Sequence, residues 1–569
     1  MKQIVECVPN FSEGRDKGVI EQIVKAIASV EGVKVLDVDP GEATNRTVVT
    51  FVGTPEAVLE AAFQGVKRSG EVIDMRKHHG AHPRSGACDV LPLVPVAGIT
   101  LEECAELARG LAKRIYSELG VPCYCYEAAA FKPERKNLAV CRAGEYEALP
   151  EKIADPARRP DFGPEEYNDT VSRCGAINVG ARNFLVAVNY NLNTTSTRRA
   201  MAIAFDVREK CRKAREGGSL TGKVLKDADG KDIWIPGTLK GCKAIGWYID
   251  EYGISQVSMN ITDITATPLH IAYEEVSRAA SARGLRVTGA EIVGLVPKCV
   301  LMDAGKYYLE KQQRSLGISE DEIMKIAVKS MSLDDLKPFD PHEKVIEYLM
   351  EDPEAAAAKE RLVRMTLKGF ADETASESPA PGGGSISAYM GALGAALGTM
   401  VANLSAHKRG WDDRWKEFSD WAEKGQAIMK ELVDLVDEDT AAFDKIMAAF
   451  GLPKGTEEEK AARAAAIEEA TLYASQVPLR TMKASYKVFE VAEAMASEGN
   501  PNSVSDAGVG ALAARSAVLG ACLNVKINAV GLMDRKKAKE MIDEAEAIAA
   551  KALAREKKIL DIVNGKIDG

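Results

Sequence analysis

The chain lacks the features of several protein classes. None of its eleven cysteines forms a CxxC pair, and its first residues lack the charged and apolar stretches of a signal peptide. We therefore expect reduced thiols and a cytoplasmic protein. An excess of positive charge is also missing, because 74 Lys and Arg face 84 Asp and Glu, for a net charge of −10. Such a chain offers no overall counter-charge to nucleic acid or to an anionic membrane, so we expect neither as a partner.

Long uncharged runs are nearly absent. The one such run, residues 385–404, has about the ~20 residues that a membrane span needs. It is rich in Ala, Ser and Gly, which favours close contact between helices. We therefore expect a closely packed helix of a helical bundle here rather than a membrane span.

Length and pattern indicate several domains. The 569 residues are about four times an average ~150-residue domain, and 46% hydrophobic with 28% charged residues is typical of globular proteins. Up to about residue 335, short β-branched runs alternate with amphipathic helical patterns, and after about residue 355 only helical patterns remain. Pro338 and Pro341 interrupt the pattern between these parts.

The sequence therefore predicts a multidomain protein: an α/β N-terminal half of two helix-backed β-sheet subdomains, followed by an all-α helical bundle. We place the subdomains at residues 1–180 and 181–335, a linker at 336–350 and the helical domain at 351–569. Strands are expected in KVLDVD, RTVVTFVG, ACDVLPLVPV, NFLVAVNYNL, ISQVSMNITD and LRVTGAEIVGLVP. The text LKDADGKDIWIPG predicts an inserted hairpin that turns at Asp229 and Gly230.

Three of the six histidines, His78, His79 and His82, lie within five residues. His78 and His82 have the i, i+4 spacing of a metal pair on a helix, but a glycine and a proline in this stretch disfavour a helix and no further ligand lies at suitable spacing. We therefore expect no metal. The residues could also be polar groups of a solvated loop. We favour a catalytic loop, because histidine titrates near neutrality and the neighbouring Arg84 could bind a carboxylate of an anionic substrate.

A second polar loop contains Asp39, Asn45 and Arg46. These residues lie in LDVDPGEATNRTVVTFVG, between two expected strands, where side chains are available to a ligand. Spacing alone leaves a ligand-binding loop and a solvated turn equally open.

Two features of the last third could carry chemistry. Gly382, Gly383 and Gly384 directly precede an expected helix, where glycines allow close approach and free N–H groups favour an anionic or carbonyl-rich partner. The pattern matches no nucleotide-binding motif, and a tight connection between helices would explain the glycines equally well. Farther along, DLVDEDTAAFDK places several carboxylates on one helix. Carboxylates in such a pattern ordinarily form the solvated face of the helix. Asp439 differs because Phe443 follows one turn later, which predicts that Asp439 is buried and that its pKa is raised.

Taken together, these stretches resemble the formimidoyltransferase-cyclodeaminase family over nearly the whole chain, in the same order. VPNFSEGRD, NRTVVTFVG, HHGAHPRSGACDVLPLVP, GWYIDEYGISQVSMNITD and EIVGLVP are similar to the formiminotransferase half. PAPGGGSISAYMGALGAALGTMVANL, DEDTAAF, LPKGTEEEKAAR and GNPNSVSDAGVGALAA are similar to the cyclodeaminase half. The resemblance implies a folate enzyme of histidine degradation. It would transfer the formimino group of N-formimino-L-glutamate to N5 of tetrahydrofolate, then cyclise 5-formiminotetrahydrofolate to 5,10-methenyltetrahydrofolate with release of ammonia.

The resemblance also implies roles for particular residues. His82 corresponds to the general base of the transferase, and Asp439 to the catalytic carboxylate of the cyclodeaminase. The family's folate-binding segment falls on residues 163–175, which are about three residues longer than in the animal enzymes. The candidate residues for binding substrate or folate are Asp39, Asn45, Arg46, Arg84, Gly163, Gly175, Gly382, Gly383, Gly384 and Asp506.

The partners expected from this resemblance are small molecules. Tetrahydrofolate would act as the one-carbon acceptor and would carry a polyglutamate tail, and the reaction needs no metal. A homo-oligomer is expected. Two rival functions stay open: a glycine formiminotransferase with cyclodeaminase or methenyltetrahydrofolate cyclohydrolase activity, and a non-catalytic folate-binding protein. The presence of both His82 and Asp439 disfavours the second rival.

Overall fold

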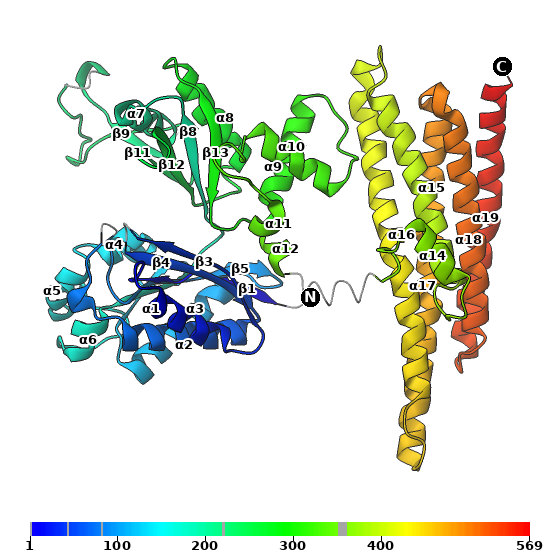
Figure 1. Ribbon diagram of the computed structural model, residues 1–569, viewed down its shortest axis with the longest axis horizontal. Coiled ribbons are helices and arrows are strands. Elements are labelled where there is room, and N and C mark those ends of the chain that lie inside the picture. The colour runs from blue at the N-terminus through cyan, green and yellow to red at the C-terminus, as the bar shows by residue number, and fades with distance from the viewer. Residues whose placement is uncertain (1–2, 43–44, 81–82, 219–221, 351–360, 569) are drawn as a thin grey trace. The chain divides into compact units, whose positions relative to one another are not determined.

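The structure, a computed structural model, describes residues 3–42, 45–80, 83–218, 222–350 and 361–568. The chain divides into two compact units, the first comprising Met1–Ala304 and Met331–Met350 and the second comprising Gly305–Ser330 and Glu351–Gly569. In Figure 1 the two sheets of the first unit run from blue to green, and the long helices of the second run from yellow to red.

The first unit begins with a mixed sheet in the order β1-β4-β2-β5-β7-β6, with β3 beside β4. Its strands are β1 (Ile4–Cys7), β2 (Asn10–Phe11), β3 (Val33–Gly41), β4 (Arg46–Gly53), β5 (Cys88–Ala97), β6 (Cys123–Glu127) and β7 (Ile177–Ala181). β7 is parallel to β5 and β6. The helices α1 (Lys17–Ala28), α2 (Pro55–Val72) and α3 (Leu101–Leu119) build an apolar core on one face. Because strand residues alternate between faces, polar side chains such as Glu6 and Asn10 lie on the other face.

A second sheet of the first unit is antiparallel, in the order β11-β12-β8-β13. Its strands are β8 (Val186–Leu192), β11 (Cys242–Ile249), β12 (Ile254–Ile261) and β13 (Val287–Val293), and it packs against α7 (Thr197–Val207) and α8 (Leu269–Ser281). Along β11, Cys242 and Ala244 are buried whereas Lys243 and Ile245 are exposed. This period of two shows that one face of the sheet packs on helices and the other is open.

An inserted hairpin precedes β11, as predicted. The strands β9 (Lys210–Lys213) and β10 (Trp234–Pro236) pair antiparallel. Beyond them, Lys226 and Asp232 form an antiparallel bridge around the turn. Gly230 has a φ of 77°, which glycine adopts without strain, so the predicted turn is confirmed.

Shorter helices complete the α/β part and the segment that follows it. They are α4 (Leu138–Arg142), α5 (Leu149–Ala154), α6 (Asp169–Cys174), α9 (Lys298–Lys311), α10 (Glu320–Ser330), α11 (Pro341–Lys344) and α12 (Ile346–Met350). The division between the two units falls within α9, and α10 belongs to the second unit.

The second unit is a bundle of long helices. They are α14 (Leu367–Thr374), α15 (Gly383–Ala406), α16 (Trp415–Phe450), α17 (Glu457–Glu498), α18 (Val504–Ala529) and α19 (Arg535–Ile567). Small residues of α15 allow close packing: an added Cβ at Gly391 would lie 2.4 Å from Ser485 Oγ, and one at Gly394 would lie 2.8 Å from the Gly510 carbonyl oxygen. Gly383–Ala406 and Pro501–Ala529 are long and apolar enough to cross a membrane, but 61% and 50% of their most apolar windows are buried in the protein. The predicted packed bundle helix is therefore confirmed for α15.

The predicted fold class is confirmed, but the units divide differently from the predicted domains. Residues 305–330 belong with the bundle, where the Leu316 N–H donates to Ser419 Oγ at 3.0 Å. The predicted linker at 336–350 is instead part of the first unit. Pro341 begins α11 after the N-cap Asp340, since proline is favoured in the first helical turn. Val345 then forms a parallel bridge with Val296.

Candidate functional site

The open faces of the two sheets of the first unit line a common cavity of about 540 Å³, which we call the intersheet cavity. This volume is within the usual range for a small-molecule site. Its ionisable lining residues are Glu6, Asp37, Asp39, Arg46, Glu127, Arg142, Arg182 and Lys243. Of the residues predicted to bind substrate or folate, Asp39 and Arg46 therefore lie in the cavity wall.

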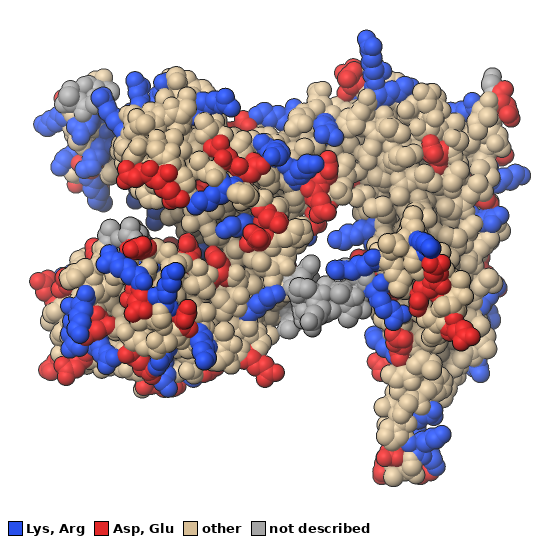
Figure 2. All heavy atoms as spheres, in the orientation of Figure 1, with Lys and Arg blue, Asp and Glu red and all other residues tan. Residues whose placement is uncertain are grey.

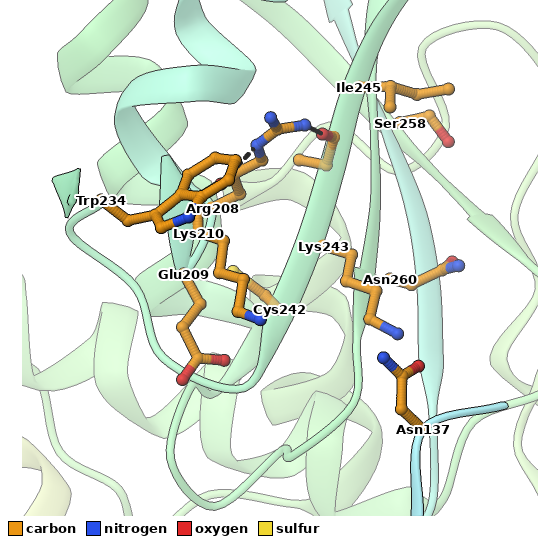
Figure 3. A pocket seen from close by; sticks show the side chains of 11 residues that line it. Asn137, Arg208, Glu209, Lys210, Trp234, Cys242, Lys243, Ile245, Ser258 and Asn260 are labelled. Carbon is orange, nitrogen blue, oxygen red and sulfur yellow. Dashed lines mark hydrogen bonds between the residues drawn. The ribbon is translucent and has the colours of Figure 1, made fainter. Parts of the chain in front are cut away.

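A second cavity of about 490 Å³ adjoins the first, since Lys243 and Asn260 line both. We call it the hairpin cavity, because Lys210 and Trp234 of the inserted hairpin form part of its wall. Figure 3 shows these side chains together with Asn137, which comes from the N-terminal part of the unit.

Carboxyl groups of the intersheet cavity have shifted acidities. Burial raises the pKa of Glu6 to about 7, and the charge of Arg182 opposes this rise. Burial also raises the pKa of Asp37 and of Glu127. The cavity therefore presents a carboxyl group, that of Glu6, which is close to half protonated at neutral pH and can either donate or accept a hydrogen bond.

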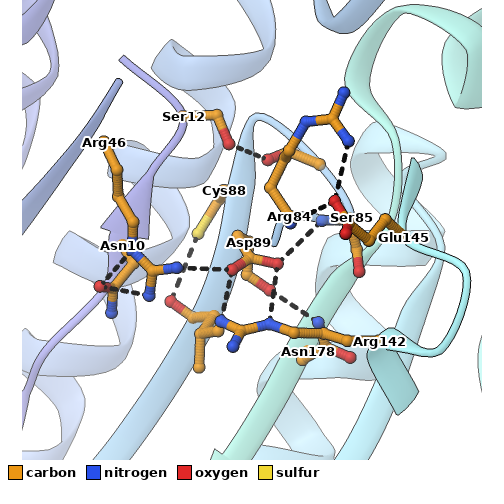
Figure 4. A network of polar contacts seen from close by, with 12 residues as sticks. Asn10, Ser12, Arg46, Arg84, Ser85, Cys88, Asp89, Arg142, Glu145 and Asn178 are labelled. Atoms are coloured by element: carbon orange, nitrogen blue, oxygen red, sulfur yellow. Dashed lines mark hydrogen bonds and ion pairs between the residues drawn. The ribbon is translucent and has the colours of Figure 1, made fainter. Parts of the chain in front are cut away.

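A buried aspartate holds two arginines of the cavity wall in place (Figure 4). Asp89, which is 1% exposed, pairs with Arg46 at 3.1 Å and with Arg142 at 2.5 Å. Arg46 also donates to Asn10 Oδ1 at 2.9 and 2.6 Å. Burial lowers the pKa of Arg46 to about 10, so its guanidinium stays charged at neutral pH. The other oxygen of Asp89 accepts a hydrogen bond from the Ser85 N–H at 2.9 Å, which ties the network to the histidine loop.

The histidine loop is anchored through His78 and Asn45. His78 Nε2 lies 2.9 Å from the Asn45 carbonyl oxygen, and Arg84 Nε donates to His78 Nδ1 at 3.4 Å. Both ring nitrogens are thus engaged, with the proton on Nε2, and burial lowers the pKa of His78. Asn45 Nδ2 donates to the His79 carbonyl at 3.0 Å, and Asn45 Oδ1 accepts from the Gly14 N–H at 3.0 Å. His78 and Asn45 therefore hold the loop, and His78 has no free nitrogen for a metal.

His82, the predicted general base, lies outside the described residues. The chain on either side of it is fixed near the intersheet cavity. On one side His79 is bound to Asn45, the neighbour of Arg46 in the sequence. On the other side the Gly86 carbonyl accepts from Ser12 Oγ at 2.7 Å. The role of His82 stays a prediction.

Arg84 is engaged elsewhere than predicted. Its guanidinium pairs with Glu145 at 3.1 Å and with Glu147 at 2.7 Å, and the residue is 8% exposed. It does not line the intersheet cavity. Two carboxylates of the protein already occupy the guanidinium, so the structure gives Arg84 an anchoring contact with the histidine loop and not a contact with a substrate carboxylate.

Gly163 and Gly175 are not brought to the cavity either. Gly163 packs against Pro160, at 3.0 Å from an added Cβ. Gly175 ends α6 with a φ of 71° and lies against the Ser85 carbonyl, 2.2 Å from an added Cβ. Their positions give them a packing function beside the histidine loop, and folate binding by the segment between them stays a prediction.

In the second unit the structure brings Asp439 to the start of α15. An added Cβ at Gly384 would lie 2.1 Å from Asp439 Oδ1, so the carboxylate approaches a backbone that only glycine leaves open. Ser385 Oγ donates to Asp439 Oδ2 at 3.2 Å and lies 3.3 Å from Thr440 Oγ1. Burial raises the pKa of Asp439, against hydrogen bonds from the side chain and backbone of Ser385. The glycine run and Asp439, predicted separately, therefore form one site.

Phe443, which we expected to bury Asp439, is itself 38% exposed. The close approach of α15 at Gly384 covers the Asp439 carboxylate. Helix α15 begins at Gly383, with Gly382 as its N-cap, so two of the three glycines lie inside the helix rather than before it.

Asp506 is distant in space from Asp439. It lies in the first turn of α18. Gly510, one turn later, packs on Gly394 and Gly398, well along α15 from Gly384. At 1.5 Å per helical residue the separation from Asp439 is roughly 20 Å or more. A cavity of about 590 Å³ beside α16 is lined by Thr440, Asp437 and Glu438, but not by Asp439.

Several groups of the candidate site were missed from the sequence. They are Glu6, Asn10, Asp37, Asp89, Glu127, Arg142, Arg182 and Lys243. Asp89 had a signal, because it is the one charged residue of the apolar strand CDVLPLVPV, and a charge in such a strand needs a partner. Among the residues that the structure describes, no group of three or more His, Cys, Asp or Glu is placed to hold a metal ion.

Comparison with family models matches the chain in three consecutive parts. Residues 4–182 match the formiminotransferase domain, N-terminal subdomain, residues 187–351 match the formiminotransferase domain, and residues 366–547 match formiminotransferase-cyclodeaminase. The first range spans the N-terminal sheet. The second spans the antiparallel sheet together with residues 305–330 of the second unit, and the third spans most of the long helices.

Curated proteins are similar to the chain over nearly its whole length or over a part of it. The chain is similar to the formimidoyltransferase-cyclodeaminase of Rattus norvegicus, with 40% identity over 97% of this chain and 98% of the relative. The glutamate formimidoyltransferase of Thermoplasma acidophilum is 42% identical over 54% of this chain and 92% of its own length. The methenyltetrahydrofolate cyclohydrolase of Methylorubrum extorquens is 42% identical over 36% of this chain and 98% of its own length.

Proposed function

Since the chain belongs to the formimidoyltransferase-cyclodeaminase family, we infer that it performs both steps of a folate-dependent one-carbon transfer. The first unit transfers the formimino group of N-formimino-L-glutamate to N5 of tetrahydrofolate. The second unit closes the ring of 5-formiminotetrahydrofolate to give 5,10-methenyltetrahydrofolate and ammonia. Tetrahydrofolate is thus the acceptor substrate of the first step, and it carries the one-carbon group through the second step.

The transferase step needs a base and an acid at one carbon atom. N5 attacks the sp² formimino carbon, a base removes the N5 proton, and the departing glutamate nitrogen receives a proton as its bond to carbon breaks. We assign these proton transfers to His82, on the resemblance that names it. The intersheet cavity is our proposed folate site, supported by its volume and by its position beside the anchored flanks of the histidine loop.

The polar wall of that cavity suits a reduced pterin. A pterin presents amino and ring N–H donors, which a carboxylate accepts. Glu6, Asp37 and Asp39 supply carboxyl groups on the N-terminal sheet. Arg46 and Arg142, held by Asp89, supply donors for acceptor atoms. We propose that these groups orient the pterin so that N5 faces the histidine loop.

The cyclodeaminase step needs a group that gives a proton to ammonia. N10 attacks the same carbon and loses its proton as the N10–C bond forms. The leaving amidine nitrogen gains a proton, its bond to carbon breaks, and ammonia departs. We assign this proton to Asp439, whose pKa is raised by burial and which therefore holds a proton more readily than an exposed aspartate. The start of α15, with Gly383 and Gly384, supplies backbone N–H groups beside it.

The observation that carries this assignment is the contact between Asp439 and the glycine start of α15. The test assays the two steps separately on the same protein: glutamate release from formiminoglutamate, and ammonia release with methenyltetrahydrofolate formation from supplied 5-formiminotetrahydrofolate. Variants of His82 and Asp439 should each remove one step and spare the other. Loss of both steps in either variant would contradict the assignment of one step to each unit.

A second candidate function concerns the helical unit and the donor. The similarity of this unit to a protein named methenyltetrahydrofolate cyclohydrolase supports a helical unit that hydrolyses the methenyl product. A transferase that uses formiminoglycine is the matching rival for the first unit. Rates measured side by side with formiminoglutamate and formiminoglycine, and with methenyltetrahydrofolate as substrate for hydrolysis, separate these possibilities.

We also propose that the protein is a cytoplasmic homo-oligomer. The support for assembly is a set of apolar side chains exposed on α15 and α18: Leu393, Met400, Leu404, Val509, Leu512, Leu523 and Ile527. Figure 2 shows broad areas without charged side chains over the helical bundle. Exposed apolar surface of this extent favours association between copies. Light scattering of the purified chain should therefore give a mass that is a multiple of 61.2 kDa.

A further inference from the structure

Two hydroxyl groups continue the polar contacts of Asp439 into the helical bundle. Ser385 Oγ donates to Asp439 Oδ2 at 3.2 Å, and the same oxygen lies 3.3 Å from Thr440 Oγ1. In the second contact either hydroxyl can be the donor. Because each hydroxyl both donates and accepts a hydrogen bond, the three side chains form a path along which a proton can pass.

The hydroxyl of Thr440 is bonded differently from that of a typical buried threonine in a helix. Such a hydroxyl often donates to the carbonyl four residues earlier. Thr481 of α17 does so, with its Oγ1 3.2 Å from the Val477 carbonyl oxygen. In the part of the chain that the structure describes, the hydrogen-bond partner of Thr440 Oγ1 is instead Ser385 Oγ. Its hydroxyl is therefore free to turn between two roles, donor and acceptor.

The path ends at the cavity of about 590 Å³ beside α16, which we call the α16 cavity. Thr440 lines this cavity, and Asp439 does not. Asp434 and Asp444 of its wall are exposed, so solvent reaches it. Ser385 is 0% exposed and Asp439 is half-buried. The two hydroxyls thus connect the Asp439 carboxylate to solvent in a cavity that the carboxylate does not itself reach.

The wall of the α16 cavity is negatively charged. Its charged residues are four carboxylates and two guanidinium groups, from Asp434, Asp437, Glu438, Asp444, Arg361 and Arg480. A negative wall concentrates cations, hydronium included, near the Thr440 hydroxyl. The charge of the whole wall produces this effect, so no single carboxylate is needed for it.

The ring closure proposed above consumes one proton that the substrate does not supply. The nitrogen of a neutral formimino group carries one hydrogen and leaves as ammonia with three. N10 loses one proton as its bond to carbon forms, and the other comes from Asp439, while the methenyl product takes the positive charge. Asp439 therefore ends each turnover as a carboxylate and must be protonated again.

We propose that Ser385 and Thr440 form a proton relay that reprotonates Asp439 from the α16 cavity while folate covers the open side of the carboxylate. The proposal rests on the function inferred above. Water gives a proton to Thr440 Oγ1, Thr440 gives one to Ser385 Oγ, and Ser385 gives one to Asp439 Oδ2. Each hydroxyl gains one proton and loses one, so both end unchanged. The two residues act through Asp439 and not on the substrate.

The test uses Thr440→Val, which removes the hydroxyl and keeps the branched shape. Thr440→Ser retains the hydroxyl. Thr481→Val is the matched control, because Thr481 is 1% exposed and its hydroxyl donates to a backbone carbonyl. Ammonia release from supplied 5-formiminotetrahydrofolate is measured for the first turnover by rapid mixing and for the steady state, in water and in deuterium oxide.

Thr440→Val should slow the steady state and spare the first turnover. A relay sets how fast Asp439 is protonated but not the equilibrium between its two forms, so the parent and the variant begin with the same protonated share. Steady-state ammonia release should fall by at least about tenfold, which is less than the loss of about 10²- to 10⁴-fold for a missing general acid. Deuterium oxide should slow the variant more than the parent, because proton delivery then limits the rate. Thr440→Ser and Thr481→Val should behave as the parent does.

Three outcomes overturn the proposal. An unchanged steady state in Thr440→Val would show that Asp439 receives its proton from the substrate side. A first turnover slowed as much as the steady state would make the hydroxyl structural, and an equal loss in Thr481→Val would assign the effect to packing.

A second variant keeps the proposal testable if Thr440→Val does not fold. Ser385→Ala breaks the same path at its other hydroxyl, and its steady state must then be slowed more than its first turnover. An equal slowing of both would overturn the relay. A parent protein that releases no ammonia from 5-formiminotetrahydrofolate would instead refute the proposed function itself, so the two failures are distinguishable.

Discussion

Replacing Asp439 by asparagine tests the assignment of the second site. The carboxylate lies against Gly384 and accepts a hydrogen bond from Ser385 Oγ at 3.2 Å. Asparagine has nearly the same shape and keeps an oxygen for this bond, but it cannot carry a proton to a leaving nitrogen at neutral pH. The change therefore removes the acid and leaves the packing of α15 against α16 in place.

The two expected effects differ greatly in size. Loss of a general acid lowers a rate by about 10²- to 10⁴-fold. The free energy of unfolding should change little. Burial raises the pKa of Asp439, which means that the charged carboxylate is disfavoured in the folded protein. The protonated form stabilises the folded protein at low pH, and this stabilisation is lost as pH rises through the folded pKa. Near neutrality, asparagine therefore removes the free-energy cost of a buried charge, but it also removes an anion from the start of α15, which costs about 0.3–1 kcal/mol.

The assay follows each step of Asp439→Asn separately. Glutamate release should continue at the parent rate, ammonia release should fall by at least about 10²-fold, and 5-formiminotetrahydrofolate should accumulate. Asp434→Asn is the matched control, because Asp434 is exposed on the same helix. Asp437 is unsuitable as a control, since its carboxylate accepts the Leu362 and Val363 N–H groups at 2.8 and 3.1 Å.

One result would refute the reasoning. If Asp439→Asn releases ammonia at the parent rate, Asp439 is an N-terminal anchor of α15 and the acid lies elsewhere. A variant that loses both steps together with its thermal transition would report unfolding. The Asp434→Asn control and a measured Tm identify that case, because a catalytic loss without a Tm change larger than a few degrees points to chemistry.

Three further variants test other parts of the account. His82→Asn should lower formimino transfer by about 10²-fold or more while ring closure from supplied 5-formiminotetrahydrofolate persists, and an unchanged transfer rate would remove His82 from the mechanism. Gly384→Ala should slow ammonia release, because the new Cβ would lie 2.1 Å from Asp439 Oδ1. Gly565→Ala is the control, because nothing lies within 4 Å of a Cβ added there. Equal rates of ammonia release in the two variants would show that the contact between Gly384 and Asp439 has no function. Glu6→Gln should stabilise the ligand-free protein increasingly as pH rises from 4.5 to about 7, because the parent's Glu6 has a raised pKa there. The gain should reach up to about 3 kcal/mol and then level off, and a pH-independent difference in unfolding free energy would contradict the burial of Glu6.

Periodicity was enough to predict the fold class, because strands and helices carry their patterns locally. The runs RTVVTFVG and ISQVSMNITD became β4 and β12. The strands INVGA and CYCYE were missed because each is short and lies next to irregular chain. They form β7, which lies between β5 and β6, and β6 at the edge of the sheet. Their tertiary partners, and not their own sequence, determine their state.

The predicted domain bounds differ from the compact units of the structure for a similar reason. Two prolines suggested a linker, but Pro341 starts a helix and Val345 pairs with Val296. The assignment of residues 305–330 to the bundle depends on contacts such as that of Asn403 Nδ2 with the Gly317 carbonyl at 2.8 Å. Contacts between segments 86 residues apart leave no local periodic signal in the chain.

The candidate site was predictable where a residue type is unusual for its position. Asp439 and the glycine run were each noticed from the sequence, although their contact and the reason for the burial of Asp439 came only from the structure. Arg84 looked free for a substrate because its partners Glu145 and Glu147 are about sixty residues away. Glu6 gave no signal, since a glutamate in a short strand is ordinarily solvated.

The most direct test of the central claim is a single reaction that contains the whole chain, tetrahydrofolate and formiminoglutamate. Glutamate, ammonia and the absorbance of methenyltetrahydrofolate are followed together, with formiminoglycine as a parallel donor. We predict that one glutamate, one ammonia and one methenyltetrahydrofolate form for each formiminoglutamate consumed, and that formiminoglycine reacts far more slowly. Glutamate release without ammonia, or faster reaction of formiminoglycine, would contradict the account.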